Sequence, residues 1–242
     1  MPGSSYKALD TAGNPSELDR FVQAAKQGSP FEEVCALGLP YTGLRCSAFA
    51  HMDESWLTVE NGELRIDVPY FQECTLGSTD DGEGKGGDTT ETGVPCGKCK
   101  DRVIGEREKW LPEALPDGGD CWLPKSEAGT KGRIIPVADE NAARATRNWF
   151  NTHDKIGTAG SVRNAVKRVA KRAGIFIEGE EKNENDWPCP HDLRDTYGHL
   201  LARKGFDRFE IKAAMGHSRV EQADDYIDLS GRETIEAFDD KW

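Results

Sequence analysis

The middle of this chain, from about residue 72 to residue 122, carries no periodic pattern of apolar residues. Its segment GSTDDGEGKGGDTTETG (77–93) is polar and rich in glycine, and it offers no side chains to a hydrophobic core. Long loops without secondary structure are uncommon inside compact domains, so such a stretch is either functional or an insertion. We therefore expect a single domain over residues 16–242 with an insertion at about 72–122. The small and polar residues 1–15 predict a disordered lead-in.

The sequence on either side of this stretch predicts a mainly α-helical fold with a small antiparallel β-sheet, an α+β class. Asn61-Gly62 separates two short apolar runs, and this pair is the strongest signal for a tight β-hairpin. Further strands are expected at 121–123 and 133–137. We expect Pro40 to stop the second helix. Helical spacing of apolar residues covers 18–25, 31–39, 42–52, 140–152, 158–173, 193–204, 208–215, 219–226 and 233–238.

The composition and the first residues of the chain exclude a membrane-spanning protein and a secreted protein. Hydrophobic residues make up 36% of the chain and charged residues 31%. No apolar run is long enough for a transmembrane helix, and the first residues lack the basic and apolar regions of a signal peptide. We therefore expect no membrane partner and a cytoplasmic location, in the host cell if a virus or plasmid encodes the chain.

The charge of the chain is unevenly distributed. The net charge is −12, yet residues 141–174 hold eight Lys or Arg and one acidic residue, so the rest of the chain sums to −19. A basic stretch on an acidic body suits a protein that presents one face to nucleic-acid phosphates. A solvated cationic helix face is the alternative, and an acidic body is also common in halophilic proteins. The residues that we expect to contact DNA are Arg163, Lys167, Arg168, Lys171 and Arg172.

The C-terminal third contains groups that can act on a phosphodiester. His191 and Arg194 are three residues apart, so they share one face at the start of a predicted helix. Gly216-His217 follows a predicted helix end, and Tyr226 comes nine residues after His217. An arginine, two imidazoles and a phenol can together bind, protonate and attack a phosphate ester.

These motifs resemble the tyrosine recombinase (phage integrase) family, whose C-terminal pattern runs H-x-L-R … L-G-H … Y. The family places a first arginine in T-G-L-R-x-S, which resembles TGLRCS around Arg45. It places a lysine in a hairpin of the form K-T-x-x-G-x-R-x-I-P, which resembles the segment that starts at Lys125 and ends at Pro136. The resemblance covers roughly residues 16–228, and several motifs in series are more specific than any one of them.

The resemblance implies a metal-free cleavage reaction that needs no cofactor. Tyr226 would attack phosphorus to form a 3′-phosphotyrosine, with Lys125 as general acid for the leaving 5′-oxygen and Lys131 as a competitor for that role. Two arginines would bind the non-bridging oxygens of the phosphate. The implied catalytic set is Arg45, Lys125, His191, Arg194, His217 and Tyr226, in which His191 accepts a proton and His217 hydrogen-bonds the phosphate.

The function implied by this resemblance is site-specific DNA recombination, as an integrase or excisionase of a mobile element carried by a virus or plasmid. Its partner would be double-stranded DNA at attachment sites, bound as a homo-tetramer, with a monomer when free. Only 44 residues precede Arg45, so we expect the N-terminal core-binding domain of the family to be absent. Where the family has a Glu after T-G-L-R-x-S, this chain has Ala48. The alternatives are a type IB topoisomerase-like enzyme and a catalytically decayed, zinc-stabilised DNA-binding module.

The cysteines suggest a metal site in the insertion. Seven cysteines without an export signal indicate reduced thiols or metal ligands. A hairpin would bring Cys74 and Cys121 together, and the pair Cys96 and Cys99 could complete a Cys₄ zinc site. Four reduced thiols in a loop are the alternative. We expect His51 and His153 to be surface residues without a partner.

Overall fold

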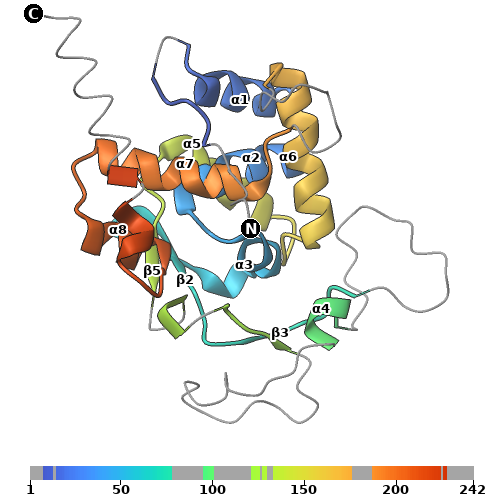
Figure 1. Ribbon diagram of the computed structural model, residues 1–242. Coiled ribbons are helices and arrows are strands. Elements are labelled where there is room, and N and C mark those ends of the chain that lie inside the picture. Colours follow the sequence, from blue (N-terminus) through green and yellow to red (C-terminus); the bar gives the residue numbers. More distant parts are fainter. Residues whose placement is uncertain are drawn as a thin grey trace, which may run out of the picture.

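The structure is a computed structural model in which helices surround one central helix (Figure 1). It describes residues 8–12, 15–77, 95–100, 121–125, 127–129, 133–175, 187–224 and 226–227. Lys131, most of the expected insertion and the expected helix at 233–238 lie outside the described residues.

The central helix is α2 (Pro30–Thr42). It packs against α1 (Glu17–Lys26), α5 (Glu140–Phe150), α6 (Ala159–Ala173) and α7 (Pro190–Arg203), so nearly all of its side chains are buried. The expectation that Pro40 would stop this helix was wrong. Its missing N–H and its ring cost about 3 kcal/mol in a helix interior, but packing on several sides outweighs that cost, and the helix ends at Gly43 in the left-handed conformation (φ 59°).

The ends of the other helices follow local capping chemistry. The side chain of Ser16 accepts a hydrogen bond from the backbone N–H of Asp19, whose carboxylate accepts one in return from the N–H of Ser16, and this capping box starts α1. Helix α8 (Arg208–Met215) has the predicted bounds and ends at Gly216 (φ 62°), whose left-handed conformation turns the chain toward His217. The short helix α3 (Cys46–His51) begins at Arg45, and residues 221–224 and 226–227 are also helical.

Two small antiparallel sheets complete the fold. The larger has the order β1 (Leu57–Glu60), β2 (Glu63–Asp67) and β5 (Ile134–Pro136). The predicted hairpin between β1 and β2 is confirmed, because Asn61 (φ 53°) and Gly62 (φ 85°) both adopt the positive φ of a type I′ turn. The smaller sheet pairs β3 (Gln72–Glu73) with β4 (Cys121–Trp122). Short helical turns lie nearby: η1 (Glu54–Trp56), α4 (Gly97–Lys100) and η3 (Glu127–Gly129).

Part of the expected lead-in is packed on the domain. Leu9 is only 3% exposed, and its backbone N–H donates to the hydroxyl of Thr196 in α7 at 2.9 Å. Residues 8–12 therefore differ from the disordered segment that their composition predicts, because the burial of Leu9 and hydrogen bonds to the helices hold them on the domain. Within the described ranges, no helix has both the length and the apolar character needed to cross a lipid bilayer.

Glu32 ties α2 to the basic helix α6. This carboxylate is buried, and it accepts hydrogen bonds from Arg168 Nε at 2.5 Å and Arg172 Nη2 at 2.7 Å. Burial alone would raise the pKa of Glu32, but the hydrogen bonds from the two guanidinium groups outweigh burial and lower it below 4.5. The two ion pairs of Glu32 therefore stabilise the fold at neutral pH.

We predict that Glu32→Gln lowers the free energy of unfolding by about 2 kcal/mol at pH 7, because it leaves two arginines without their carboxylate. A depressed folded-state pKa contributes stability above 4.5, and that contribution is lost as the pH falls through the folded-state pKa. The difference between wild type and variant should therefore shrink in acid. Urea unfolding between pH 7 and pH 3 measures it, with Glu33→Gln as the control; an equal difference at both ends would contradict the assignment.

Candidate active site

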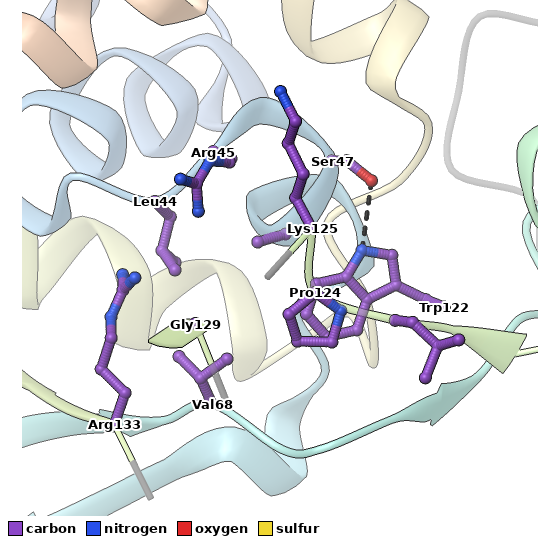
Figure 2. A pocket seen from close by; sticks show the side chains of 11 residues that line it. Leu44, Arg45, Ser47, Val68, Trp122, Pro124, Lys125, Gly129 and Arg133 are labelled. Atoms are coloured by element: carbon purple, nitrogen blue, oxygen red, sulfur yellow. Dashed lines mark hydrogen bonds between the residues drawn. The ribbon is translucent and has the colours of Figure 1, made fainter. Parts of the chain in front are cut away.

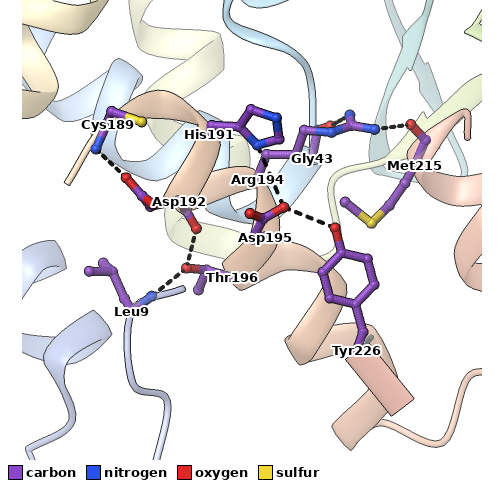
Figure 3. Close-up of polar contacts among 10 residues, drawn as sticks. All are labelled: Leu9, Gly43, Cys189, His191, Asp192, Arg194, Asp195, Thr196, Met215 and Tyr226. Carbon is purple, nitrogen blue, oxygen red and sulfur yellow. Dashed lines mark hydrogen bonds and ion pairs between the residues drawn. The ribbon is translucent and has the colours of Figure 1, made fainter. Parts of the chain in front are cut away.

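Arg194 lies at the centre of the candidate site. The side chain is 2% exposed and projects from α7. Its Nη2 donates to the carbonyl of Met215 at 2.6 Å, and its Nη1 donates to the carbonyl of Gly43 (Figure 3). Burial, followed by the nearby positive charges of Arg45 and Arg133, lowers the pKa of Arg194 to about 9. Arg194 thus stays protonated at neutral pH and joins the loop before α3 to the end of α8.

Arg45 and Lys125 reach the site from two other segments. Arg45 is the N-cap residue of α3 and is half-buried, and burial lowers its pKa. Lys125 follows β4 and is exposed. Both side chains line a cavity of about 290 Å³, together with Arg133 (Figure 2). The structure therefore brings the first predicted arginine and the predicted lysine to one cavity, while Lys131 lies outside the described residues.

Tyr226 and His191 meet at a carboxylate that the sequence analysis missed. The Tyr226 hydroxyl donates to Asp195 Oδ1 at 2.9 Å, and His191 Nδ1 lies 3.6 Å from the same oxygen (Figure 3). Tyr226 is buried, whereas His191 is exposed. Asp195 is four residues after His191 on one helix, and that spacing is the signal that could have identified it.

His217 is a buried neutral imidazole. It is 6% exposed, and its ring stacks on Tyr226 with centroids 6.1 Å apart and an interplanar angle of 26°. Burial, followed by the positive charges of Arg194 and Arg45, lowers the pKa of His217 to about 3. Its Nδ1 has no hydrogen-bond partner among the described residues. A neutral ring in this place can donate a hydrogen bond to an anion without adding charge.

The residues expected to bind DNA lie on α6, but most of them already contact other residues of the protein. Arg168 and Arg172 pair with Glu32, and Lys171 Nζ lies 5.2 Å from the centre of the Trp187 ring. Arg163 is exposed and Lys167 is half-buried. The charge that the helix offers to a ligand is therefore smaller than its composition suggests.

A second cluster of reactive side chains lies at the other end of α3. It consists of His51, Cys74, Cys96 and Cys99, whose ligand atoms all lie within 4.8 Å of one another. His51 Nε2 is 3.3 Å from the sulfur of Cys74, 3.7 Å from that of Cys96 and 3.6 Å from that of Cys99. The expectation that His51 would be a partnerless surface residue was wrong, since it is 5% exposed and in contact with all three thiols.

Cys121 was wrongly assigned to this cluster, and strand geometry gives the reason. The predicted pairing of the two strands does form, but the residue opposite Cys121 is Glu73 rather than Cys74. Paired residues point to the same face of a sheet, and successive residues point to opposite faces. Cys121 therefore projects away from the face that carries Cys74, and His51 supplies the fourth ligand atom in its place.

The cluster fits a tetrahedral metal site of the His-Cys₃ type. A zinc ion with usual bond lengths separates sulfur and nitrogen ligands by about 3.6 Å, which is close to the three sulfur-to-nitrogen distances. His51 Nδ1 lies 2.8 Å from the carbonyl of Ser47, so this nitrogen carries the proton and Nε2 faces the thiols. Cys96 and Cys99 also form a turn, in which the N–H of Cys99 donates to the carbonyl of Cys96 at 2.8 Å.

We predict that Asp195→Asn lowers the pKa of His191. A hydrogen bond to the Asp195 carboxylate is the main cause that raises the pKa of this imidazole above 6.5, with burial opposing it. Without the carboxylate charge, the titration midpoint of His191 should fall. NMR titration of the histidine ring protons measures the shift, and His153 provides an internal control. An unchanged midpoint would show that Asp195 and His191 do not interact in solution.

Comparison with known proteins gives relatives for about half of the chain. No protein-family model matches the sequence. The tyrosine recombinase XerC of Corynebacterium glutamicum is 30% identical over 125 residues, which cover 46% of this chain and 37% of that relative. An integrase/recombinase of Escherichia coli is 28% identical over 142 residues, which cover 50% of this chain and 40% of the relative. The matches thus span well under half the length of these relatives.

Solved structures share the fold over nearly the whole chain. XerA recombinase covers 98% of this chain with a TM-score of 0.56 and 16% identity, and the match spans 66% of XerA. The Tn1549 transposon integrase in complex with a circular intermediate DNA also covers 98%, with a TM-score of 0.57 and 18% identity over 67% of its length. The mostly helical fold with small antiparallel sheets is therefore shared with these recombinase and integrase structures, and about half of the chain is similar in sequence to a tyrosine recombinase and to an integrase/recombinase.

Proposed function

We propose that this chain is the catalytic part of a site-specific DNA recombinase, which cuts and rejoins DNA through a 3′-phosphotyrosine at Tyr226. The observation that carries this proposal is the position of the Tyr226 hydroxyl. The hydroxyl donates to Asp195 at 2.9 Å, the Tyr226 ring stacks on the neutral His217, and the charges of Arg45 and Arg194 lie close enough to interact with the hydroxyl. This arrangement combines a nucleophile, a proton acceptor and positive charge for a phosphate.

In this reaction the Tyr226 oxygen forms a bond to phosphorus as the bond from phosphorus to the 5′-oxygen breaks. Arg45 and Arg194 bind the non-bridging oxygens and stabilise the charge that develops on them. Arg194 is well suited to this role because two protein carbonyls fix its orientation before any substrate binds. Lys125 donates a proton to the departing 5′-oxygen, and rejoining reverses these steps.

The proton of Tyr226 leaves by way of Asp195. The hydroxyl already donates to this carboxylate, and Asp195 in turn contacts the exposed His191. His191 thus acts as the proton acceptor through Asp195 rather than by direct contact with the tyrosine. His217 donates a hydrogen bond to the phosphate, as its low pKa and neutral ring allow.

The partner proposed for this site is double-stranded DNA. Among the similar structures, XerH is described as bound to a palindromic difH substrate in a post-cleavage complex, and the Tn1549 integrase as bound to circular intermediate DNA. By analogy we propose a homo-tetramer on paired attachment sites and a monomer in the absence of DNA. The exposed Arg163 and its neighbours on α6 would contribute phosphate contacts.

The remaining expectations of the sequence analysis belong to the same proposal. We propose that residues 16–242 form a catalytic domain with an insertion at about 72–122. A mobile element, carried by a virus or plasmid of a halophilic organism, would encode the protein. The protein would act in the cytoplasm of the host cell. The net charge of −12 supports the halophilic part of this proposal.

We predict a covalent DNA adduct that depends on Tyr226. The probe is a pool of duplexes with random sequence on both sides of one 5′-bridging phosphorothiolate, whose sulfur leaves without protonation and cannot rejoin the strand. Denaturing gels over a salt series should show an adduct with wild type and none with Tyr226→Phe, while Tyr70→Phe should behave as wild type. DNA binding without any adduct would instead favour the decayed DNA-binding module.

The same probe tests Lys125 and the topoisomerase alternative. Lys125→Ala should lose most adduct formation on ordinary duplexes and regain it on the phosphorothiolate pool, since a thiolate needs no general acid. An equal loss on both probes would exclude Lys125 as the acid. Sequences recovered from the adducts can then be built into paired sites. Strand exchange between two sites supports a recombinase, whereas relaxation of a supercoiled plasmid alone supports a topoisomerase.

We further propose that the cluster of His51, Cys74, Cys96 and Cys99 holds one structural zinc ion that positions the active site. Helix α3 follows its N-cap residue Arg45 and ends at His51. Trp122 stacks on the His51 ring with centroids 6.0 Å apart, and its Nε1 donates to Ser47 Oγ at 3.1 Å. A zinc ion would therefore fix both α3 and the segment that leads from β4 to Lys125.

We predict one zinc ion per chain in protein prepared without chelators. His51→Ala and Cys99→Ser should each lose it, because they remove ligands, whereas Cys121→Ser should keep it. Metal analysis by mass spectrometry measures the stoichiometry. Retention of zinc in His51→Ala together with its loss in Cys121→Ser would favour the Cys₄ set, and wild type without stoichiometric zinc would refute the proposal.

A further inference from the structure

Arg133 is a buried arginine that the catalytic set of the sequence analysis does not include. It directly precedes β5, and its side chain is 9% exposed. It lines the same cavity as Arg45 and Lys125, on the side formed by Val68 and Gly129 (Figure 2). A buried guanidinium inside the fold needs a reason, because burying a charge without full pairing is costly.

The hydrogen bonds of Arg133 account for only part of its guanidinium. Nη1 donates to the carbonyl of Met215 at 2.9 Å, and the same carbonyl accepts the bond from Arg194 Nη2 at 2.6 Å. Nε and Nη2 of Arg133 are buried and have no hydrogen-bond partner among the described residues. Two donors on one guanidinium, fixed by the bond at Nη1, are the geometry that binds two oxygens of a phosphate.

The surroundings of Arg133 are positive rather than neutralising. Arg45 and Arg194 are its charged neighbours: Arg45 lowers the pKa of both Arg133 and Arg194, and Arg133 lowers the pKa of Arg194. In the described part of the chain, no carboxylate forms an ion pair with Arg133. Three guanidinium groups that repel one another in a buried site gain stability when an anion binds between them.

Gly216 shows that this position of the guanidinium is built into the fold. A Cβ atom at Gly216 would lie 2.3 Å from Arg133 Nη1, so a larger residue would displace the side chain. The same glycine has a φ of 62° and leads directly into His217. The glycine that turns the chain toward His217 therefore also leaves the space that Arg133 occupies.

We infer that Arg133 is a further catalytic residue, a third guanidinium that binds the non-bridging oxygens of the scissile phosphate through Nε and Nη2. This inference rests on the proposed function of Tyr226. Arg133 exchanges no proton and forms no covalent bond; it stabilises the negative charge that grows on phosphorus oxygens as the Tyr226 oxygen adds and the 5′-oxygen departs. A purely structural role, in which Arg133 only holds the Met215 carbonyl at the end of α8, is the alternative.

The test compares Arg133→Ala with wild type on two probes. Each is the phosphorothiolate duplex described above, and in the second a methyl group replaces one non-bridging oxygen of the same phosphate, in either diastereomer. On the charged phosphate we expect Arg133→Ala to slow adduct formation by about 100-fold or more, as for loss of one donor to a developing oxyanion. On at least one methyl diastereomer the loss should shrink to about tenfold or less, because the contacted charge is gone.

The controls separate the possible failures. Arg65→Ala removes a surface arginine that pairs with Glu60, and it should match wild type on both probes. Equal losses for Arg133→Ala on the phosphate and on both methyl diastereomers would overturn the inference and leave a structural role. Failure of wild type to form any adduct would instead refute the proposed function, and the inference with it.

Folding of the variant is checked by thermal unfolding. If Arg133→Ala does not fold, Arg133→Lys takes its place, because lysine keeps the charge and one donor to the Met215 carbonyl but lacks the paired donors. This variant should also be slowed on the charged phosphate and relieved on the methyl probe. Wild-type rates for Arg133→Lys on the charged phosphate would overturn the two-donor contact.

Discussion

The buried guanidinium of Arg194 holds together the segments on which the candidate site depends. Its two terminal nitrogens reach the carbonyls of Gly43 and Met215, which are far apart in the sequence. Gly43 leads into Arg45, and Met215 leads into His217 through one glycine. Burying a charged group to 2% exposure is costly, and hydrogen bonds to its donors reduce that cost. The same bonds that make its burial tolerable therefore fix the geometry of the site.

Much of the fold could be predicted from the sequence because its signals are local. Asn61-Gly62 specifies a type I′ hairpin by its backbone preference, and Ser16 with Asp19 specifies a helix start by side-chain hydrogen bonds. The predictions that were wrong concern features that tertiary packing determines. Helix α2 continues past Pro40 because neighbouring helices enclose it, and Leu9 is buried because it joins a core cluster that forms only in the folded domain. Neither effect leaves a periodic signal in the chain.

The residues of the candidate site also fall into two groups, those that local motifs predict and those that depend on tertiary contacts. Motif spacing identified the residues that the structure gathers around Arg194, since those motifs each belong to one turn or one helix start. It missed Asp195, whose importance depends on the approach of Tyr226 from another segment. It also chose Cys121 over His51, because the sequence shows that two strands pair but not which face of the sheet each side chain takes. Strand register is a property of the folded sheet.

The distribution of charge follows from these constraints. The chain is strongly acidic, yet Arg45, Arg133 and Arg194 meet where no described carboxylate pairs with Arg133. On α6 the reverse holds, because Glu32 neutralises two of the five basic residues. Part of the positive charge on α6 is thus neutralised by ion pairs within the protein, whereas the buried arginines keep their charge. The strongest attraction for a phosphate is consequently expected at the cavity lined by Arg45, Lys125 and Arg133, where burial strengthens the interaction of each charge, rather than along the basic helix α6.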